Sequence, residues 1–281
     1  MNGKWQFKRL AAKALAAAMT VGTVLGNSGS LVYASAVPRP ITETPGEATQ
    51  VSGISYAPSV SMVDTQAIDA AAALYSYLDG VGKSPYVLYG HQNDTHHKGG
   101  GSFEGSTSSD TKDLTGSIAA VVGIDSLSLT GAELAKPTGE KDSVDEAAAI
   151  SIAAAAEGAI ITMSAHMPNF AEVKEKGTDR DGDYDYSAYS SNTTTGAVMD
   201  EILPGGELND VYNGFLDIIA RYALILQDAG VPVLFRPFHE NNGSWFWWGA
   251  SFCDEETYKN VYRYTVEYLR DGKGVHNFLY V

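Results

Sequence analysis

The sequence contains a single cysteine, Cys253, among 281 residues, so no disulfide can form within the chain. Basic residues are also scarce: 19 Lys and Arg stand against 34 Asp and Glu, which gives a formal net charge of −15. Nucleic acid and anionic lipid repel such a protein, so we expect neither as a partner. The negative charge neither attracts nor repels a neutral polysaccharide. A chain of this length can bury a sizeable core, so an oxidising destination is compatible without disulfides.

Motifs that would indicate a cofactor or metal are missing. No G-x-G-x-x-G or P-loop pattern follows an apolar run, which argues against a nucleotide. His239-Glu240 lacks the second histidine of a zinc-binding H-E-x-x-H helix. Residues 179–186 carry alternating aspartates, but the glycine and the final glutamate of a calcium-binding EF-hand are not at their places. We favour a solvated acidic loop there over a calcium site, and we expect no metal and no cofactor.

Residues 1–36 have the pattern of a secretory signal peptide. Four basic residues come first, an apolar stretch follows at 14–25, and Ala34-Ser35-Ala36 has the spacing that signal peptidase reads. The apolar stretch is too short for a stable bilayer anchor. We therefore expect cleavage after Ala36, secretion to the extracellular space and no membrane attachment afterwards. Residues 37–60, which are punctuated by proline and glycine, are predicted to be a linker.

Apolar runs alternate with Ala- and Leu-rich helical stretches along the rest of the chain. Each run is apolar throughout, as in strands buried on both faces, and the alternation predicts βαβ units and a parallel sheet. Polar residues follow each of the first four runs, where (β/α)8 barrels and open α/β sheets bind ligands. The predicted strands are 86–90, 118–123, 159–163, 231–235 and 278–281, and the predicted helices are 64–78, 144–156, 209–227 and 255–269.

The most informative stretch is VPVLFRPFHENNGSWFWWGA, residues 231–250. A buried strand ends there in Arg236, His239 and Glu240, and three of the four tryptophans follow between positions 245 and 248. Flat aromatic rings stack on the C–H faces of sugars, and carboxylate, amide and imidazole groups bind their hydroxyls. A carboxyl group against indole rings is poorly hydrated, which raises its pKa and suits it to act as a general acid. The stretch predicts a sugar site; the alternative is a packed loop with core tryptophans and a Glu240–Arg236 ion pair.

The segment RPFHENNGSWFWWG resembles the acid/base segment of glycoside hydrolase family 26, whose members include secreted endo-β-1,4-mannanases. YGHQND at 89–94 and SAHM at 164–167 are similar to two other strand endings of that family, although Ala165 replaces an aromatic residue. The similarity runs from about residue 62 to the last residue. It implies an α/β protein with a (β/α)8 TIM barrel, incomplete here with about five of eight strands. Residues 61–281 would form the N-terminal part of this catalytic barrel.

The resemblance also implies a function, the retaining hydrolysis of internal β-1,4-mannosidic bonds in mannan or galactomannan. Glu240 would be the general acid/base. The residues implied to bind or line the substrate are His166, His239, Trp245, Arg236, Asn241 and Trp248.

Retaining hydrolysis needs a second carboxylate about 5–5.5 Å from the first. In the family it ends the seventh strand, and no segment of this sequence matches it. We therefore expect the nucleophile to lie beyond Val281, which would leave this chain incomplete and inactive by itself. Two alternatives stay open. One is a non-catalytic carbohydrate-binding protein, and the other is a β-glucanase or xylanase of the same family.

Overall fold

The computed structural model describes residues 62–98, 101–102, 107–133, 142–187 and 198–281. All of these belong to one compact unit, residues 33–281. The signal peptide and the linker predicted for residues 1–36 and 37–60 lie outside the described residues and stay predictions. Within the described ranges, every helix is too short or too polar to cross a bilayer.

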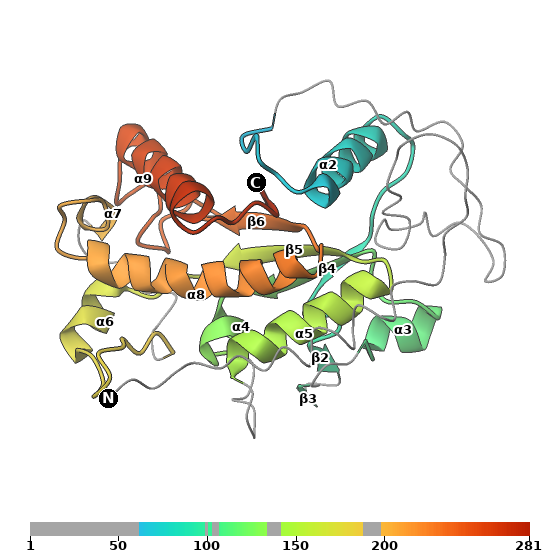
Figure 1. The fold of residues 1–281 in the computed structure, drawn as a ribbon, viewed down its shortest axis with the longest axis horizontal. Coiled ribbons are helices and arrows are strands. Elements are labelled where there is room, and N and C mark those ends of the chain that lie inside the picture. Colours follow the sequence, from blue (N-terminus) through green and yellow to red (C-terminus); the bar gives the residue numbers. More distant parts are fainter. Residues whose placement is uncertain (1–61, 99–100, 103–106, 134–141, 188–197) are drawn as a thin grey trace. The chain divides into compact units, whose positions relative to one another are not determined.

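Five parallel strands form the centre of the fold and lie side by side in chain order (Figure 1). Helices connect the later strands, which is the progression of a (β/α)8 barrel. This arrangement confirms the predicted α/β class, with five strands of the barrel present. The strands are β1 (Gly90–Gln92), β4 (Val121–Asp125), β5 (Ile160–Ala165), β6 (Val233–Pro237) and β7 (Phe278–Tyr280), and a short antiparallel pair, β2 (His97–Lys98) with β3 (Gly101–Ser102), follows β1.

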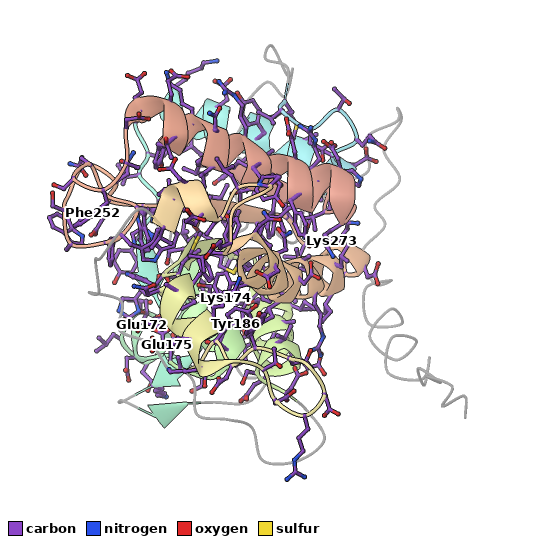
Figure 2. All side chains as sticks on the ribbon, turned by 90° about the vertical axis from the view of Figure 1, so that its left-hand side faces the viewer. Glu172, Lys174, Glu175, Tyr186, Phe252 and Lys273 are labelled. Atoms are coloured by element: carbon purple, nitrogen blue, oxygen red, sulfur yellow. The ribbon has the colours of Figure 1, made fainter. Side chains whose placement is uncertain are left out.

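Three long helices pack against the outer face of this sheet: α5 (Ser143–Ala156), α8 (Asn209–Asp228) and α9 (Glu255–Glu267). Two of them begin at aspartates whose carboxylates accept hydrogen bonds from the first free backbone amides, Asp142 before α5 and Asp254 before α9. The shorter elements are α3 (Asp110–Thr115), α4 (Leu127–Thr130), α6 (Phe170–Lys176), α7 (Val198–Glu201) and the π-helical turn η1 (Tyr268–Gly272). Figure 2 looks onto α6, which carries Glu172, Lys174 and Glu175.

The helix α2 (Asp69–Gly82) covers the opposite, inner face of the sheet (Figure 1). Its buried Leu74 and Tyr77 pack with Ile160 and Leu279 near the amino-terminal ends of the strands. A hydrogen-bonded pair fixes the chain just before α2, because Asp64 Oδ2 lies 2.8 Å from Nδ1 of His276. The inner face is therefore closed by α2 at one end of the strands, and its functional groups lie at the other end.

The structure corrects the predicted boundaries. Strands β4, β5 and β6 begin one to three residues later than their apolar runs. They end two residues later, because polar residues such as Asp125 and Ser164 still pair within the sheet. The run 86–90 is wrong as a buried strand: Val87 is 89% exposed, and the first strand is the polar Gly90–Gln92. The first helix begins at Asp69 rather than Asp64.

Candidate active site

Three side chains from neighbouring strands line up at the carboxyl end of the sheet. The register pairs Asp125 of β4 with Ser164 of β5, and Ser164 with Arg236 of β6. Each lies an even number of residues after a residue that packs with α2, so all three belong to the inner face. Barrels assemble their active sites from side chains at this end of the strands.

Asp125 is a buried carboxylate that is saturated with donors. Its Oδ2 accepts hydrogen bonds from Ser164 Oγ at 2.6 Å and His166 Nδ1 at 2.8 Å, and its Oδ1 accepts from the amide of Leu127 at 3.0 Å. Burial works to raise the pKa of Asp125, but the hydrogen bonds and the charge of His166 outweigh it and hold the pKa below its usual value. The group is therefore an ionised anchor for its neighbours.

The His166 and His239 rings meet edge to face. Their Nε2 atoms are 3.2 Å apart, and their ring centroids are 4.4 Å apart. The hydrogen bond to Asp125 raises the pKa of His166 against the opposing effect of burial. Burial lowers the pKa of His239, and the charge on His166 lowers it further. The two imidazoles thus differ in proton affinity although they touch.

The loop after β6 turns sharply so that Glu240 leaves the sheet. Phe238 has φ of 54° and Glu240 has φ of 57°, a left-handed conformation that costs a non-glycine residue about 1–2 kcal/mol. The Phe238 ring is buried, and the Glu240 side chain is exposed. Trp245 Nε1 donates a 2.8 Å hydrogen bond to Glu240 Oε2, and the Trp245 side chain is itself 50% exposed. An accessible carboxylate and an accessible indole therefore form one surface.

A buried aromatic stack supports this surface. The rings of Phe246 and Trp248 are parallel at 4.3 Å between centroids, and the edge of Trp247 meets Trp248 at 5.2 Å. Trp248 Nε1 donates to the backbone carbonyl of His239 at 2.8 Å, and Trp247 Nε1 donates to that of Pro168 at 3.0 Å. Figure 2 marks the continuation of this loop towards α9 by Phe252.

The structure brings four of the predicted site residues together: Glu240 bonds Trp245, and His166 contacts His239. Trp248 supports this group from within the core rather than presenting a face to ligand. Arg236 and Asn241 are exposed nearby, on β6 and in the following loop.

Two expectations for this loop need correction. Glu240 was expected to be poorly hydrated among indole rings, but its carboxylate is exposed and contacts an indole N–H rather than ring faces. Only one of the three clustered tryptophans faces solvent, because Trp247 and Trp248 are core residues.

The sequence did not single out several residues that shape the site. One of them is Asp125, whose contact with His166 follows from the pairing of adjacent parallel strands, because Asp125 ends β4 and His166 directly follows β5. Glu133 also acts electrostatically on His166, and its carboxylate accepts hydrogen bonds from Asn93 and Ser128. In the part of the chain that the structure describes, no group of three or more His, Cys, Asp or Glu side chains could hold a metal ion.

Parallel βα units that gather polar side chains at the carboxyl ends of their strands have the arrangement of a barrel enzyme. Residues 63–281 match the protein-family model of glycosyl hydrolase family 26. The chain belongs to this family.

Individual relatives agree with the assignment. The chain is 38% identical over 241 residues to a mannan endo-1,4-beta-mannosidase of Bifidobacterium adolescentis, in an alignment that covers 84% of this chain and 22% of the relative. It is similar to the catalytic domain of the Bacillus sp. JAMB-750 GH26 endo-beta-1,4-mannanase (TM-score 0.66, 38% identity), which covers 79% of this chain and 55% of that one.

A modular endo-beta-1,4-mannanase from Cellulomonas fimi gives a TM-score of 0.64 at 37% identity, covering 79% of this chain and 47% of that one. The chain thus spans about half the length of these solved structures, and less than a quarter of the Bifidobacterium relative.

Proposed function

We propose that the protein is a secreted, retaining endo-β-1,4-mannanase in which Glu240 is the general acid/base. The observation that carries the proposal is the hydrogen bond from Trp245 Nε1 to Glu240 Oε2. It places a carboxyl group that can transfer a proton beside a half-exposed aromatic ring on which a sugar can stack. A bound polysaccharide could therefore present its glycosidic oxygen to Glu240 while a neighbouring sugar ring lies on Trp245. The mannanase names of the relatives support mannan as the substrate.

Each residue then has a defined task. Glu240 protonates the glycosidic oxygen while a second carboxylate attacks the anomeric carbon, so the C–O bond breaks and a glycosyl-enzyme ester forms. Glu240 next takes a proton from the water that attacks the ester, which restores both carboxyl groups. Trp245 stacks on the sugar beside the scissile bond, and His166, His239, Arg236 and Asn241 bind hydroxyl groups around it.

The attacking carboxylate is a separate part of the proposal. Asp125 is unsuited to it, since that carboxylate is buried and accepts hydrogen bonds from Ser164 and His166. Glu133 is tied to Asn93 and Ser128. We place the nucleophile beyond Val281, so a polypeptide that ends there should release no sugar. Cleavage after Ala36 belongs to the proposal too, and N-terminal sequencing of the exported protein tests it.

The test is hydrolysis by the full-length protein of galactomannan, barley β-glucan and xylan, read as reducing ends released. Glu240→Gln should slow galactomannan hydrolysis by at least the ~10²–10⁴-fold typical of losing a general acid. A dinitrophenyl mannoside needs no protonation of its leaving group, so its first step should suffer less. Glu175→Gln, an exposed change on α6, is the matched control.

Three outcomes overturn parts of the proposal. Equal losses on both substrate types remove Glu240 from the acid role. Preference for barley β-glucan or xylan replaces mannan as the substrate. Binding of these polymers without any release of reducing ends replaces the enzyme with a carbohydrate-binding protein.

A further inference from the structure

Asp125 is a buried charge that neither step of the proposed hydrolysis uses. Its side chain is only 4% exposed, and its partners are Ser164 in β5, His166 directly after β5 and the amide of Leu127 at the start of α4. Burying an ion costs free energy unless hydrogen bonds compensate it. Much of this compensation comes from one candidate site residue, because the ring of His166 supplies one of the two shortest hydrogen bonds to the carboxylate.

The contact of His166 with Asp125 determines what His166 can offer to His239. A carboxylate accepts only from a protonated nitrogen, so His166 carries its proton on Nδ1, and its Nε2 points at Nε2 of His239. The two Nε2 atoms are 3.2 Å apart, so a single hydrogen lies between them in one hydrogen bond. Nδ1 of His239 is buried without a hydrogen-bond partner among the described residues. Among the described residues, the polar contact of the His239 ring is therefore the one with His166.

Other charges face the pair from each element around it. Glu240 from the loop after β6 and Glu133 from the segment after α4 both favour the charged form of His166. Arg236 of β6 opposes protonation of His239, whereas Asp125 and Glu240 favour it. Of these charged groups, Asp125 is the one hydrogen-bonded to the ring of His166, so it has the strongest influence on the orientation of that ring.

We propose that Asp125 is a positioning residue for Glu240: through His166 it fixes the ring of His239, the residue that directly precedes the acid. The His239 residue is then held at two points, its ring by His166 and its carbonyl by the indole N–H of Trp248 at 2.8 Å. The same carbonyl belongs to the peptide that links His239 to Glu240. Restraint of this peptide opposes its rotation and so favours the left-handed conformation of Glu240, whose φ is 57°. The inference rests on the proposed function only for its kinetic consequence.

Asp125→Asn in the full-length protein is the main test. The asparagine keeps the shape and one acceptor but removes the charge, so the titration of His166 should move to lower pH. Galactomannan hydrolysis should lose ~10–100-fold, the usual cost of removing the partner that orients a site histidine in metal enzymes, mainly in kcat rather than KM. Ser164→Ala is the comparison, because it removes a donor to Asp125 and leaves the charge and the His166 contact; its His166 titration should stay in place.

Nitrogen-15 NMR of the histidine side chains gives a readout that needs no activity. In the unaltered protein His166 should be protonated at Nδ1 throughout its titration, with His166→Gln and His239→Gln used to assign the signals. A His166 that carries its neutral-form proton on Nε2 overturns the proposal, even if Asp125→Asn fails to fold. Equal effects of Asp125→Asn and Ser164→Ala on the His166 titration also overturn it, since they would indicate a merely structural role. If the unaltered protein does not hydrolyse mannan, the proposed function is wrong, and the NMR result alone decides this inference.

Discussion

The six-membered ring of Trp245 lies directly against the α-carbon of Gly243. A Cβ atom at Gly243 would overlap three atoms of that ring. The amide of Gly243 also donates to the carbonyl oxygen of Glu240 at 2.9 Å, while the Trp245 indole donates to its carboxylate. The glycine, the indole and the acid therefore form one contact set, in which the ring reaches Glu240 because residue 243 has no side chain.

Gly243→Ala should displace the Trp245 ring and break its bond to Glu240. Misplacement of a catalytic group by about 1 Å can cost ~10²-fold in rate, so we expect kcat/KM on galactomannan to fall by that order. Gly82→Ala is the control, because no atom lies within 4 Å of the added Cβ at the end of α2. If Gly243→Ala retains full activity and the fluorescence of Trp245 is unchanged, the ring does not depend on the glycine.

Trp245 and Trp248 should respond differently to truncation. Trp245 is 50% exposed, so Trp245→Ala should reduce activity strongly with little change in melting temperature. Trp248 is fully buried, so Trp248→Ala should lower the free energy of unfolding by ~3–5 kcal/mol. Trp245→Phe separates two functions of the indole, because it keeps a flat ring and removes the N–H that bonds Glu240. Thermal melts recorded beside kinetics check all three; a large fall in melting temperature for Trp245→Ala would make it a core residue.

The Asp125–His166 pair should make stability depend on pH in a defined window. The folded-state pKa of Asp125 is lowered, so its contribution is present above the usual 3.8 and is lost as pH falls through the folded value. The folded-state pKa of His166 is raised, so its contribution is complete below 6.5 and is lost as pH rises through the folded value. The melting-temperature difference between the unaltered protein and Asp125→Asn should therefore be largest between 3.8 and 6.5. Asn260→Ala, an exposed change that removes no titratable group, should show a flat difference, and a flat profile for Asp125→Asn would contradict the prediction.

Asn277 should matter for stability alone. Its buried amide donates to the carbonyl oxygens of Ala223 in α8 and Val231 before β6, at 3.0 and 2.9 Å. Asn277→Ala would leave both carbonyls without these donors, and an unsatisfied buried polar group costs about 1–3 kcal/mol. Urea unfolding should show this loss, with hydrolysis per folded molecule unchanged. Asn260→Ala on the exposed side of α9 should stay within about 0.5 kcal/mol of the unaltered protein.

Sequence periodicity predicted the parallel order of the sheet but not its edges. Long apolar runs identify strands buried on both faces, so β4, β5 and β6 were found. Their carboxyl ends were missed because Asp125, Ser164 and Arg236 pair within the sheet as polar residues. The strand β1 is three exposed residues, Gly90–Gln92, and it carries no apolar signal.

The candidate site was predictable where its residues lie close together in one segment of the chain. Residues 236–248 supplied Glu240, His239 and Trp245 together, and the family resemblance added His166. The exposure of Glu240 could not be predicted, since it depends on the left-handed turn at Phe238 and Glu240. The overlap of Gly243 with the Trp245 ring is a three-dimensional contact that no spacing in a single sequence encodes.

The hydrogen bond between Asp64 and His276 joins residues 212 apart, so it closes nearly the whole described chain into a loop. Closing such a long loop costs conformational entropy before the contact can form, whereas local βα units assemble without this cost. The helix α2 should therefore dock onto β7 late in folding and detach first when the protein opens. Native-state hydrogen exchange should report this as amides of α2 that exchange through a sub-global opening, while those of β5 wait for global unfolding. In such an opened form the apolar inner-face residues Ile160 and Leu279 become accessible, so we expect aggregation of this fold to start from the uncovered face of the sheet.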